Sequence, residues 1–365
     1  MSPQRREIHS TYIEWAKLRS HARYNLASSR VLDFPLAELG AHIDDLEISG
    51  PEGYGYSPLI KRLAAKTGVP EDSVVHTQGT SMANHLAMAS LIEAGDEVLV
   101  EEPAYEAILA TALYLGACIR RFPRRFEAGF QVDPREVERA ISPRTRLIIL
   151  TNLHNPSGVR ASEDTLKVVG EIARSLGGHV LVDEVYMEFC FDSSWQPAFS
   201  LGPNFVSTGS LTKACGLGGL RCGWILAAPP LAKRMWRIND LFGVTAPHPT
   251  ELLSAIALDK LPQITARAKG LLDTNRMLLK GFLDSRRDLI AIWPKEGPMA
   301  FPQLADGHAD AFCRLLSEKY ETSVVPGHHF EMPEHFRIGV GGNTEDVREG
   351  LLRVAAALDE FAARR

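Results

Sequence analysis

The stretch SLTKACGLGGLRCGW, residues 210–224, indicates the fold and the chemistry better than any other part of the sequence. Lys213 lies among hydroxyls and glycines after a short apolar run at 204–207, and Arg221 follows eight residues later. A lysine at the end of a buried strand loses water, which destabilises its ammonium form and lowers its pKa. Such an amine is a candidate for an imine with a carbonyl compound. A glycine-rich turn with a solvated lysine explains this stretch, taken alone, equally well.

Composition and charge exclude several classes of protein. The 365-residue chain has a formal net charge of −5, without the basic tract that nucleic acid or an anionic membrane would require. No apolar run approaches the length of a membrane span, and residues 1–20 lack a signal-peptide core. Five cysteines are scattered without the spacing of metal ligands, so we expect a cytoplasmic protein without a metal site.

Apolar strands and helices alternate through the middle of the chain. Strands are predicted at 74–78, 97–101, 118–122, 145–151, 179–183, 205–207 and 223–227, and helices at 9–23, 58–67, 80–93, 104–116, 134–141 and 162–177. Continuous Val/Ile/Leu runs separated by helices are typical of an α/β fold with a mostly parallel, doubly wound sheet. A long helix at 264–285 then leads to strands at 299–301 and 336–340 and helices at 310–320 and 345–362. We therefore predict a large domain at 40–263 and a smaller α+β domain formed by 1–39 and 264–365.

Polar side chains follow the predicted strands at their carboxyl ends, where ligand sites of such sheets lie. Thr80 and Ser81 open a helix whose free N–H groups suit a phosphate, although ordinary capping explains Thr80 as well. Tyr105 follows strand 97–101, and a core position is its simpler explanation. Asn155 follows strand 145–151 in His-Asn-Pro-Ser-Gly, which is also a common turn sequence.

The next two strand ends carry charged residues. Asp183 ends an apolar strand, where a carboxylate is costly unless a cation, backbone N–H groups or a local arginine meets it, and Tyr186 follows. Ser210, Lys213 and Arg221 then bring a hydroxyl, an amine and a guanidinium, the last suited to bidentate phosphate binding. Together these residues form the set that pyridoxal 5′-phosphate needs: an anion site, an amine, a carboxylate for the pyridine nitrogen, donors for the ring oxygen and a stacking aromatic.

This pattern resembles that of fold-type I pyridoxal-phosphate enzymes, and within them the class I/II aminotransferases typified by aspartate aminotransferase. The resemblance runs from about residue 25 to the C-terminus. It rests on the motif at 154–158, on Asp183-x-x-Tyr186 and on Ser210-x-x-Lys213 with Arg221. It implies pyridoxal 5′-phosphate as cofactor, an α-amino acid and a 2-oxo acid as substrates, and a homodimer with shared active sites.

The resemblance also implies a role for each residue. Lys213 forms the imine with the cofactor and carries the proton, Asp183 holds the pyridinium, and Asn155 and Tyr186 bind the ring oxygen. Tyr105 stacks on the ring, Arg337 binds the substrate carboxylate, and Asn155 also contacts the substrate. The phosphate is bound by Thr80, Ser81, Ser210 and Arg221.

Two positions depart from the family pattern. A tyrosine of the neighbouring subunit normally reaches the phosphate, and its usual place here is Gly50, so we assign the role to Tyr54, with Tyr56 next. Many relatives have a glycine near the substrate carboxylate where this chain has Ala27-Ser28-Ser29, and we assign Ser29 as a substrate contact. No second arginine for a side-chain carboxylate is identifiable, so the sequence does not indicate dicarboxylic substrates.

Three functions are compatible with these residues. A transaminase is the leading hypothesis. A β- or γ-lyase or an amino-acid cyclase would use the same fixed residues, and the motifs do not exclude it. A non-enzymatic sensor domain of a transcription regulator is disfavoured by the intact Lys213 and by the absence of a DNA-binding extension.

Overall fold

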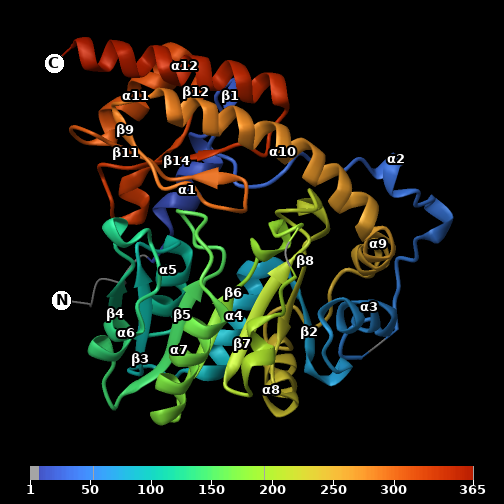
Figure 1. Ribbon diagram of the computed structural model, residues 1–365. Helices are drawn as coiled ribbons and strands as arrows, with labels where there is room; N and C mark the ends of the chain where they lie inside the picture. Colours follow the sequence, from blue (N-terminus) through green and yellow to red (C-terminus); the bar gives the residue numbers. More distant parts are fainter. Residues whose placement is uncertain (1–7, 52, 193, 365) are drawn as a thin grey trace, which may run out of the picture.

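The computed structural model describes residues 8–51, 53–192 and 194–364, and its centre is a seven-stranded sheet (Figure 1). The strands of this sheet are β2 Val74–Gln78, β3 Glu97–Glu102, β4 Cys118–Pro123, β5 Thr145–Thr151, β6 His179–Asp183, β7 Phe205–Ser210 and β8 Cys222–Leu226. They lie in the order β2-β8-β7-β6-β5-β3-β4. Only β8 runs antiparallel to its neighbours, β2 and β7. The predicted α/β fold with a mostly parallel sheet is therefore confirmed.

Helices cover both faces of the sheet, because successive strand residues point to opposite sides. In β3, Val98 and Val100 belong to one core cluster and Leu99 belongs to the other. The first cluster lies under α4 Gly79–Leu91, α5 Glu106–Tyr114 and α8 Pro229–Asn239, and the second under α6 Pro134–Ala140 and α7 Glu163–Ser175.

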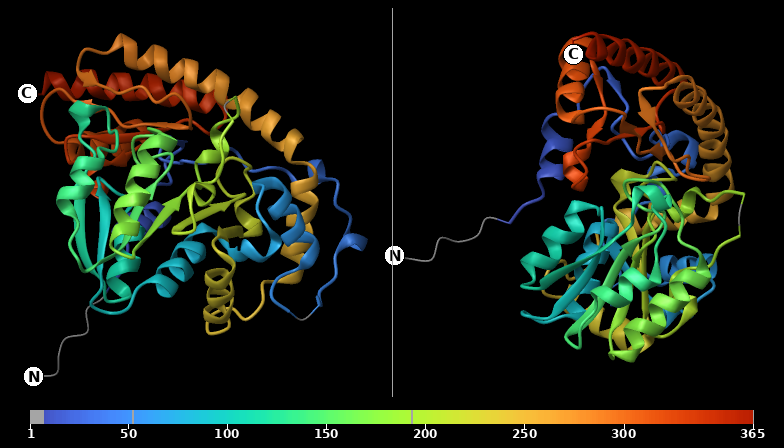
Figure 2. Two further views of the ribbon diagram at one scale, coloured as in Figure 1. Left: turned by 60° about the horizontal axis from the view of Figure 1, so that its bottom comes forward. Right: turned by 60° about the vertical axis from the view of Figure 1, so that its left-hand side comes forward.

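A second group of elements lies beyond the carboxyl ends of the parallel strands (Figure 1). It has its own apolar cluster, in which Leu26 packs with residues of three long helices, α10, α11 and α12. Two of these, α10 and α12, run side by side in both views of Figure 2. The N-terminal segment joins this group, since Tyr24 pairs with Thr322 in a short parallel ladder. The remaining elements are α1 Thr11–Leu18, β1 Tyr24–Asn25, α2 Leu36–Leu39, α3 Ser57–Thr67, α9 His248–Asp259, α10 Leu261–Ser285, β9 Leu289–Ile290, β10 Met299–Ala300, β11 Gln303–Leu304, α11 Ala309–Tyr320, β12 Thr322–Ser323, β13 Val325–Pro326, β14 Phe336–Gly339 and α12 Thr344–Ala363.

Several boundaries differ from the predicted ones. α1 is shorter than the predicted helix at 9–23, and β7 continues to Ser210, beside Lys213. Helices α8 and α9 were not predicted, although prolines in their first turns are compatible with helix starts. None of the helices in the described ranges is long and apolar enough to cross a membrane.

Candidate active site

The carboxyl ends of β5, β6 and β7 border a cavity of about 280 Å³. Nine of the predicted site residues line it: Thr80, Ser81, Tyr105, Asn155, Asp183, Tyr186, Ser210, Lys213 and Arg221. Two more, Ser29 and Arg337, lie in the wall behind it, each hydrogen-bonded to a lining residue. The last, Tyr54, lies elsewhere. Residues from seven separate parts of the chain thus meet at the edge of the sheet where the sequence placed the site.

Asp183 is buried at the end of β6 and is held by donors on both carboxylate oxygens. Asn84 Nδ2 donates to Oδ2 at 2.8 Å, and the backbone N–H of Val185 donates to Oδ1 at 3.1 Å. Asn84 is itself oriented by Thr208, whose hydroxyl donates to its amide oxygen at 2.7 Å. Burial raises the pKa of Asp183, and the Asn84 and Val185 hydrogen bonds partly offset this. A cation placed beside this carboxylate would therefore be strongly favoured.

Lys213 follows β7, and its Nζ donates to Ser29 Oγ at 3.3 Å. The Tyr186 hydroxyl donates to the same Ser29 oxygen at 2.7 Å. Burial lowers the pKa of Lys213, and the positive charge of Arg337 lowers it further, against opposing effects of Tyr12 and Asp183. An amine with a lowered pKa is a better nucleophile and base at neutral pH.

One end of the cavity is suited to an anion. Thr80, at the start of α4, has a buried hydroxyl oxygen with no hydrogen-bond partner within the described ranges. The Arg221 guanidinium lies over Gly79, and within the described part of the chain it donates to the backbone oxygens of Gly218 and Gln78, both at 3.3 Å. Gly79 has φ +80°, and a methyl group on its Cα would collide with that guanidinium. The N-terminus of α4, the unpartnered Thr80 hydroxyl and the Arg221 guanidinium, which has no carboxylate partner in the described chain, together suit a phosphate.

Arg337 is completely buried next to Asn155. Its Nη1 donates to Asn155 Oδ1 at 2.6 Å, and its Nη2 donates to the Tyr12 hydroxyl at 2.8 Å and to Ala27 O at 3.2 Å. Because a guanidinium only donates, it fixes the amide of Asn155 with the oxygen toward Arg337 and leaves the NH₂ group as a donor. Its Nε has no partner, and no carboxylate is paired with Arg337 among residues 8–51, 53–192 and 194–364. A buried, unpaired guanidinium favours a bound carboxylate.

Tyr12 was not among the predicted site residues, and it comes from helix α1. Its ring lies edge-on to Tyr105, with ring centres 5.8 Å apart, and its side chain lines the cavity. The start of α1 is held by Glu106, whose carboxylate accepts from Ser10 Oγ, from both N–H and hydroxyl of Thr11, and from the N–H of Tyr12 at 2.6 Å. Glu106 thereby fixes α1 as one wall of the site.

Tyr54 and Tyr56 do not line this cavity within the chain. Tyr54 is 57 % exposed, and its hydroxyl donates to Asp240 at 3.1 Å. Tyr56 lies beside His248 in an edge-to-face contact at 4.9 Å. The assignment of Tyr54 to a neighbouring subunit's phosphate site stays a prediction.

Sequence reasoning missed Asn84, Tyr12 and Thr151, which also line the cavity. A signal existed for Asn84, because it lies four residues after Thr80 and therefore on the same face of α4. For Tyr12 there was none, since its position depends on how α1 docks from a distant part of the chain.

Known proteins similar to this chain align with most of its length. It is 28% identical to capreomycidine synthase of Streptomyces vinaceus, over 96% of this chain and 93% of that protein. It is also 28% identical to an arginine–pyruvate transaminase of Pseudomonas aeruginosa, over 90% and 88% of the two chains. A crystal structure of a PLP-dependent aminotransferase from Streptococcus suis superposes with a TM-score of 0.91 at 25% identity and covers 99% of both chains.

The residues of the cavity fit the cofactor that these similarities imply, pyridoxal 5′-phosphate. The unpartnered Thr80 hydroxyl and the Arg221 guanidinium over Gly79 form an anion site, and the buried Asp183 suits a protonated pyridine nitrogen. Lys213, between these two ends, carries the amine that its aldehyde requires.

The family comparison covers most of the chain. Residues 25–354 match the family model described as aminotransferase class I and II. This range includes every predicted site residue. The chain therefore belongs to the class I and II aminotransferases and uses pyridoxal 5′-phosphate as its cofactor.

Proposed function

We propose that this protein transfers an amino group between an α-amino acid and a 2-oxo acid. One observation carries the proposal. The guanidinium of Arg337 is fully buried, has no carboxylate partner in the described chain and donates to Asn155, which lines the cavity. Both substrates of a transaminase have a carboxylate beside the reacting carbon. A carboxylate bound to Arg337 would compete with the Tyr12 hydroxyl for Nη2 and would orient the substrate toward Lys213.

The residues divide the chemistry between them. Pyridoxal 5′-phosphate, held by these residues, would supply an electron acceptor for the substrate carbon. Lys213, whose pKa is lowered by burial, takes the proton of that carbon and returns it as a general base and acid. Asp183 would keep the ring nitrogen protonated, and Asn155 Nδ2 would donate to the ring oxygen. The Tyr186 hydroxyl, which donates to Ser29 Oγ in this structure, would turn to donate to the same ring oxygen. Tyr105 stacks on the ring, Ser29 orients Lys213 and Tyr186, and Thr80, Ser81, Ser210 and Arg221 bind the phosphate.

A cyclase or lyase is the second candidate. It is favoured by the similarity to the PLP-dependent cyclase OrfR, whose crystal structure superposes with a TM-score of 0.87 at 26% identity over 99% of this chain. Lys213 and Asp183 would serve that reaction as well. The two candidate functions therefore differ in the steps that follow removal of the proton from the substrate carbon.

Dependence on a 2-oxo acid distinguishes the two functions. We expect the holoenzyme, mixed with each of the twenty standard amino acids, to bleach the visible band of its cofactor once, and to turn over only when pyruvate or 2-oxoglutarate is added. Rapid absorption measurements and product analysis by mass spectrometry would show this. Continuous release of ammonia or of a cyclic product without an acceptor would instead establish the second candidate.

We also propose a homodimer with shared active sites. The segment before α3 and the loop after α8 expose several large apolar side chains: Ile43 at 84%, Ile48 at 88%, Tyr54 at 57% and Leu241 at 81%. Such exposure is unfavourable unless another surface covers it, and a two-fold partner would cover it reciprocally. Tyr54 would then reach the phosphate site of the partner.

Complementation between two inactive chains tests the shared site. When Lys213→Ala chains exchange subunits with Tyr54→Phe chains, half of the sites in each heterodimer combine both defects and half have neither. Activity should therefore rise above that of either parent. Tyr54→Phe alone must be clearly impaired for this test, and Tyr56→Phe replaces it otherwise. A fully active monomer, measured by light scattering at assay concentration, would contradict the proposal.

Two further features belong to the same proposal. The division into domains 40–263 and 1–39 with 264–365 is supported by the separate apolar cluster around α10, α11 and α12. A cytoplasmic location is supported by the five cysteines, all of which are free thiols.

A further inference from the structure

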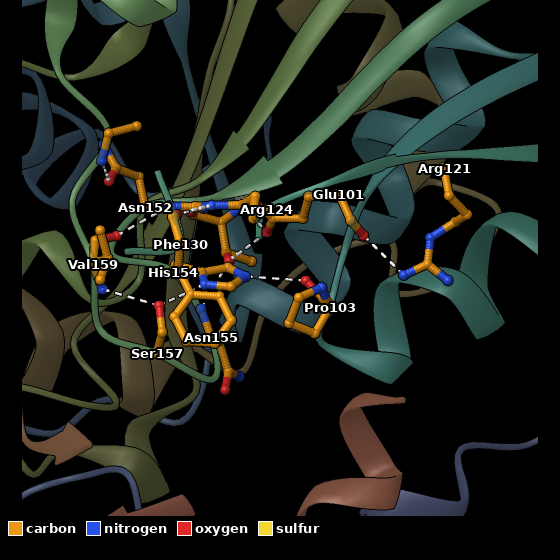
Figure 3. A network of polar contacts seen from close by, with 12 residues as sticks. Glu101, Pro103, Arg121, Arg124, Phe130, Asn152, His154, Asn155, Ser157 and Val159 are labelled. Atoms are coloured by element: carbon orange, nitrogen blue, oxygen red, sulfur yellow. Dashed lines mark hydrogen bonds and ion pairs between the residues drawn. The ribbon is translucent and has the colours of Figure 1, made fainter. Parts of the chain in front are cut away.

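A buried ion pair lies directly behind the loop that carries Asn155 (Figure 3). Arg124 and Glu101 are each 1% exposed, and Nη1 lies 2.8 Å from Oε2. Neither residue lines the cavity, and the Asn155 side chain points away from both of them in Figure 3. The ion pair therefore has no direct contact with a bound ligand.

Arg124 holds both ends of the Asn155 loop. Its Nη1 donates to the Thr151 carbonyl oxygen, where the loop begins, and its Nη2 donates to the Val159 carbonyl oxygen, where the loop ends, both at 3.4 Å. Its Nε donates to the Phe130 carbonyl oxygen at 2.7 Å. One side chain thus fixes the span of the loop.

Glu101 connects this guanidinium to Asn155 through one hydroxyl. Its Oε1 accepts from the backbone N–H and from the hydroxyl of Thr151, both at 2.6 Å. The Thr151 Oγ1 in turn accepts from the backbone N–H of Asn155 at 2.9 Å. Since the hydroxyl proton is directed to Glu101, the Thr151 oxygen is oriented as an acceptor for Asn155. The chain of contacts then continues from Asn155 Oδ1 to Arg337 at 2.6 Å.

A buried ion pair of this kind adds little to stability compared with apolar residues of similar size, because both charges lose water. A fully satisfied buried network does, however, hold its members in one geometry. The geometry held here is that of the loop backbone from which the Asn155 amide projects.

We propose that Glu101 and Arg124 are positioning residues for catalysis, which act through the Thr151 hydroxyl to set the Asn155 amide between the cofactor ring and Arg337. This inference rests on the proposed function, in which Asn155 donates to the ring oxygen of the cofactor. Loss of the Thr151 hydroxyl lets the loop shift, weakens that hydrogen bond and misaligns Arg337.

The chain offers a closely matched control at the other end of β5. Thr145 is also 2% exposed, its hydroxyl donates to the buried Glu97 at 2.5 Å, and its Oγ1 accepts from the backbone N–H of Ser142 at 2.9 Å. Thr151→Val and Thr145→Val therefore remove nearly the same pair of hydrogen bonds from one strand. Only the hydrogen bonds of the Thr151 hydroxyl include one to Asn155.

The test compares these two variants in holoenzyme reconstituted with pyridoxal 5′-phosphate, alone and combined with Asn155→Ala. The measured quantities are the pH midpoint of the cofactor's visible absorbance change, the rate of the first half-reaction with the amino acid that reacts fastest in the twenty-member panel, and the thermal midpoint of unfolding. A donor to the ring oxygen favours its anionic form, so a weakened donor raises the pH midpoint.

We expect Thr151→Val to slow the half-reaction about tenfold and to raise the pH midpoint by up to about one unit, a tenfold change in proton affinity. Thr145→Val should lower the thermal midpoint of unfolding by about as much as Thr151→Val does. It should change neither the half-reaction rate nor the pH midpoint. In the Asn155→Ala background, Thr151→Val should add less than about a twofold effect, because residues that act through one another are not additive.

Equal kinetic and spectroscopic effects of the two threonine variants, or full additivity with Asn155→Ala, would overturn the inference while leaving the proposed function in place. An Asn155→Ala chain with unchanged rate and spectrum would overturn the role of Asn155 and this inference together. If Thr151→Val does not fold, Thr151→Cys, of similar size with a weakly hydrogen-bonding thiol, carries the same expectations.

Discussion

Lys213→Ala is expected to abolish the covalent attachment of the cofactor and to reduce the amino-acid half-reaction by at least about 10³-fold. The loss combines two effects, because the same amine anchors the aldehyde and moves the substrate proton, and a positioned general base alone contributes roughly 10²–10⁴-fold. Borohydride reduction of the wild-type holoenzyme, followed by peptide mass spectrometry, should find the cofactor label on Lys213. The label should be absent from the variant.

The control is Lys233→Ala, which removes an exposed lysine from α8. It should keep the visible band, the label on Lys213 and the rate within about twofold, as expected for a surface substitution. A label on Lys233 in the wild-type chain, or a Lys213→Ala chain that retains its half-reaction rate, would contradict the assignment.

The sheet was predictable because its strands are long apolar runs bounded by turn residues. β2, β5 and β6 begin and end where the sequence predicted, and most of their residues are buried, on both faces of the sheet. β7 was predicted too short, because Thr208, Gly209 and Ser210 are polar or small although they lie in the ladder. Their strand conformation is imposed by pairing with β8, which the residues themselves do not signal.

The site was predictable where its residues follow strands and less so where they depend on docking. Asp183, Asn155 and Lys213 occur at strand ends, and the sheet alone brings them together. Tyr12 and Ser29 reach the site only because the N-terminal segment packs across it, which no local pattern specifies.

The buried ion pair behind the Asn155 loop was harder still to predict. Glu101 and Arg124 look in the sequence like charged residues near strand ends, yet both are buried, and their partners lie up to 50 residues away for Glu101 and up to 35 for Arg124. Since most charged residues remain in water, a sequence gives no reason to choose these two over the chain's other acids and bases.

Asp183→Asn is expected to retain the cofactor on Lys213 but to slow the amino-acid half-reaction by roughly two to three orders of magnitude, the value of one buried charge-assisted hydrogen bond. Both described partners of the carboxylate, Asn84 Nδ2 and the Val185 N–H, are donors. An asparagine here has one oxygen for these two donors, so its NH₂ group must face one of them or the cofactor ring. With the NH₂ group toward the ring, no acceptor faces the ring nitrogen. With it toward a protein donor, the amide oxygen can still accept from the ring nitrogen but lacks the negative charge that keeps this nitrogen protonated, so the substrate carbon loses most of its electron acceptor. Stopped-flow absorbance measures the rate of the half-reaction, and the borohydride label on Lys213 measures whether the cofactor is retained.

The neighbouring residue supplies the control for this last substitution. Glu184 is also buried, its carboxylate accepts from the Ala198 N–H at 2.9 Å, and burial raises its pKa to about 8. Glu184 is therefore mostly uncharged at pH 7, and Glu184→Gln replaces one neutral side chain by another of the same shape. It should change the half-reaction by only a few-fold, since no charge near the ring is lost. If Asp183→Asn were as mild as Glu184→Gln, the Asp183 carboxylate would have a structural role, and the proton on the ring nitrogen would need another source.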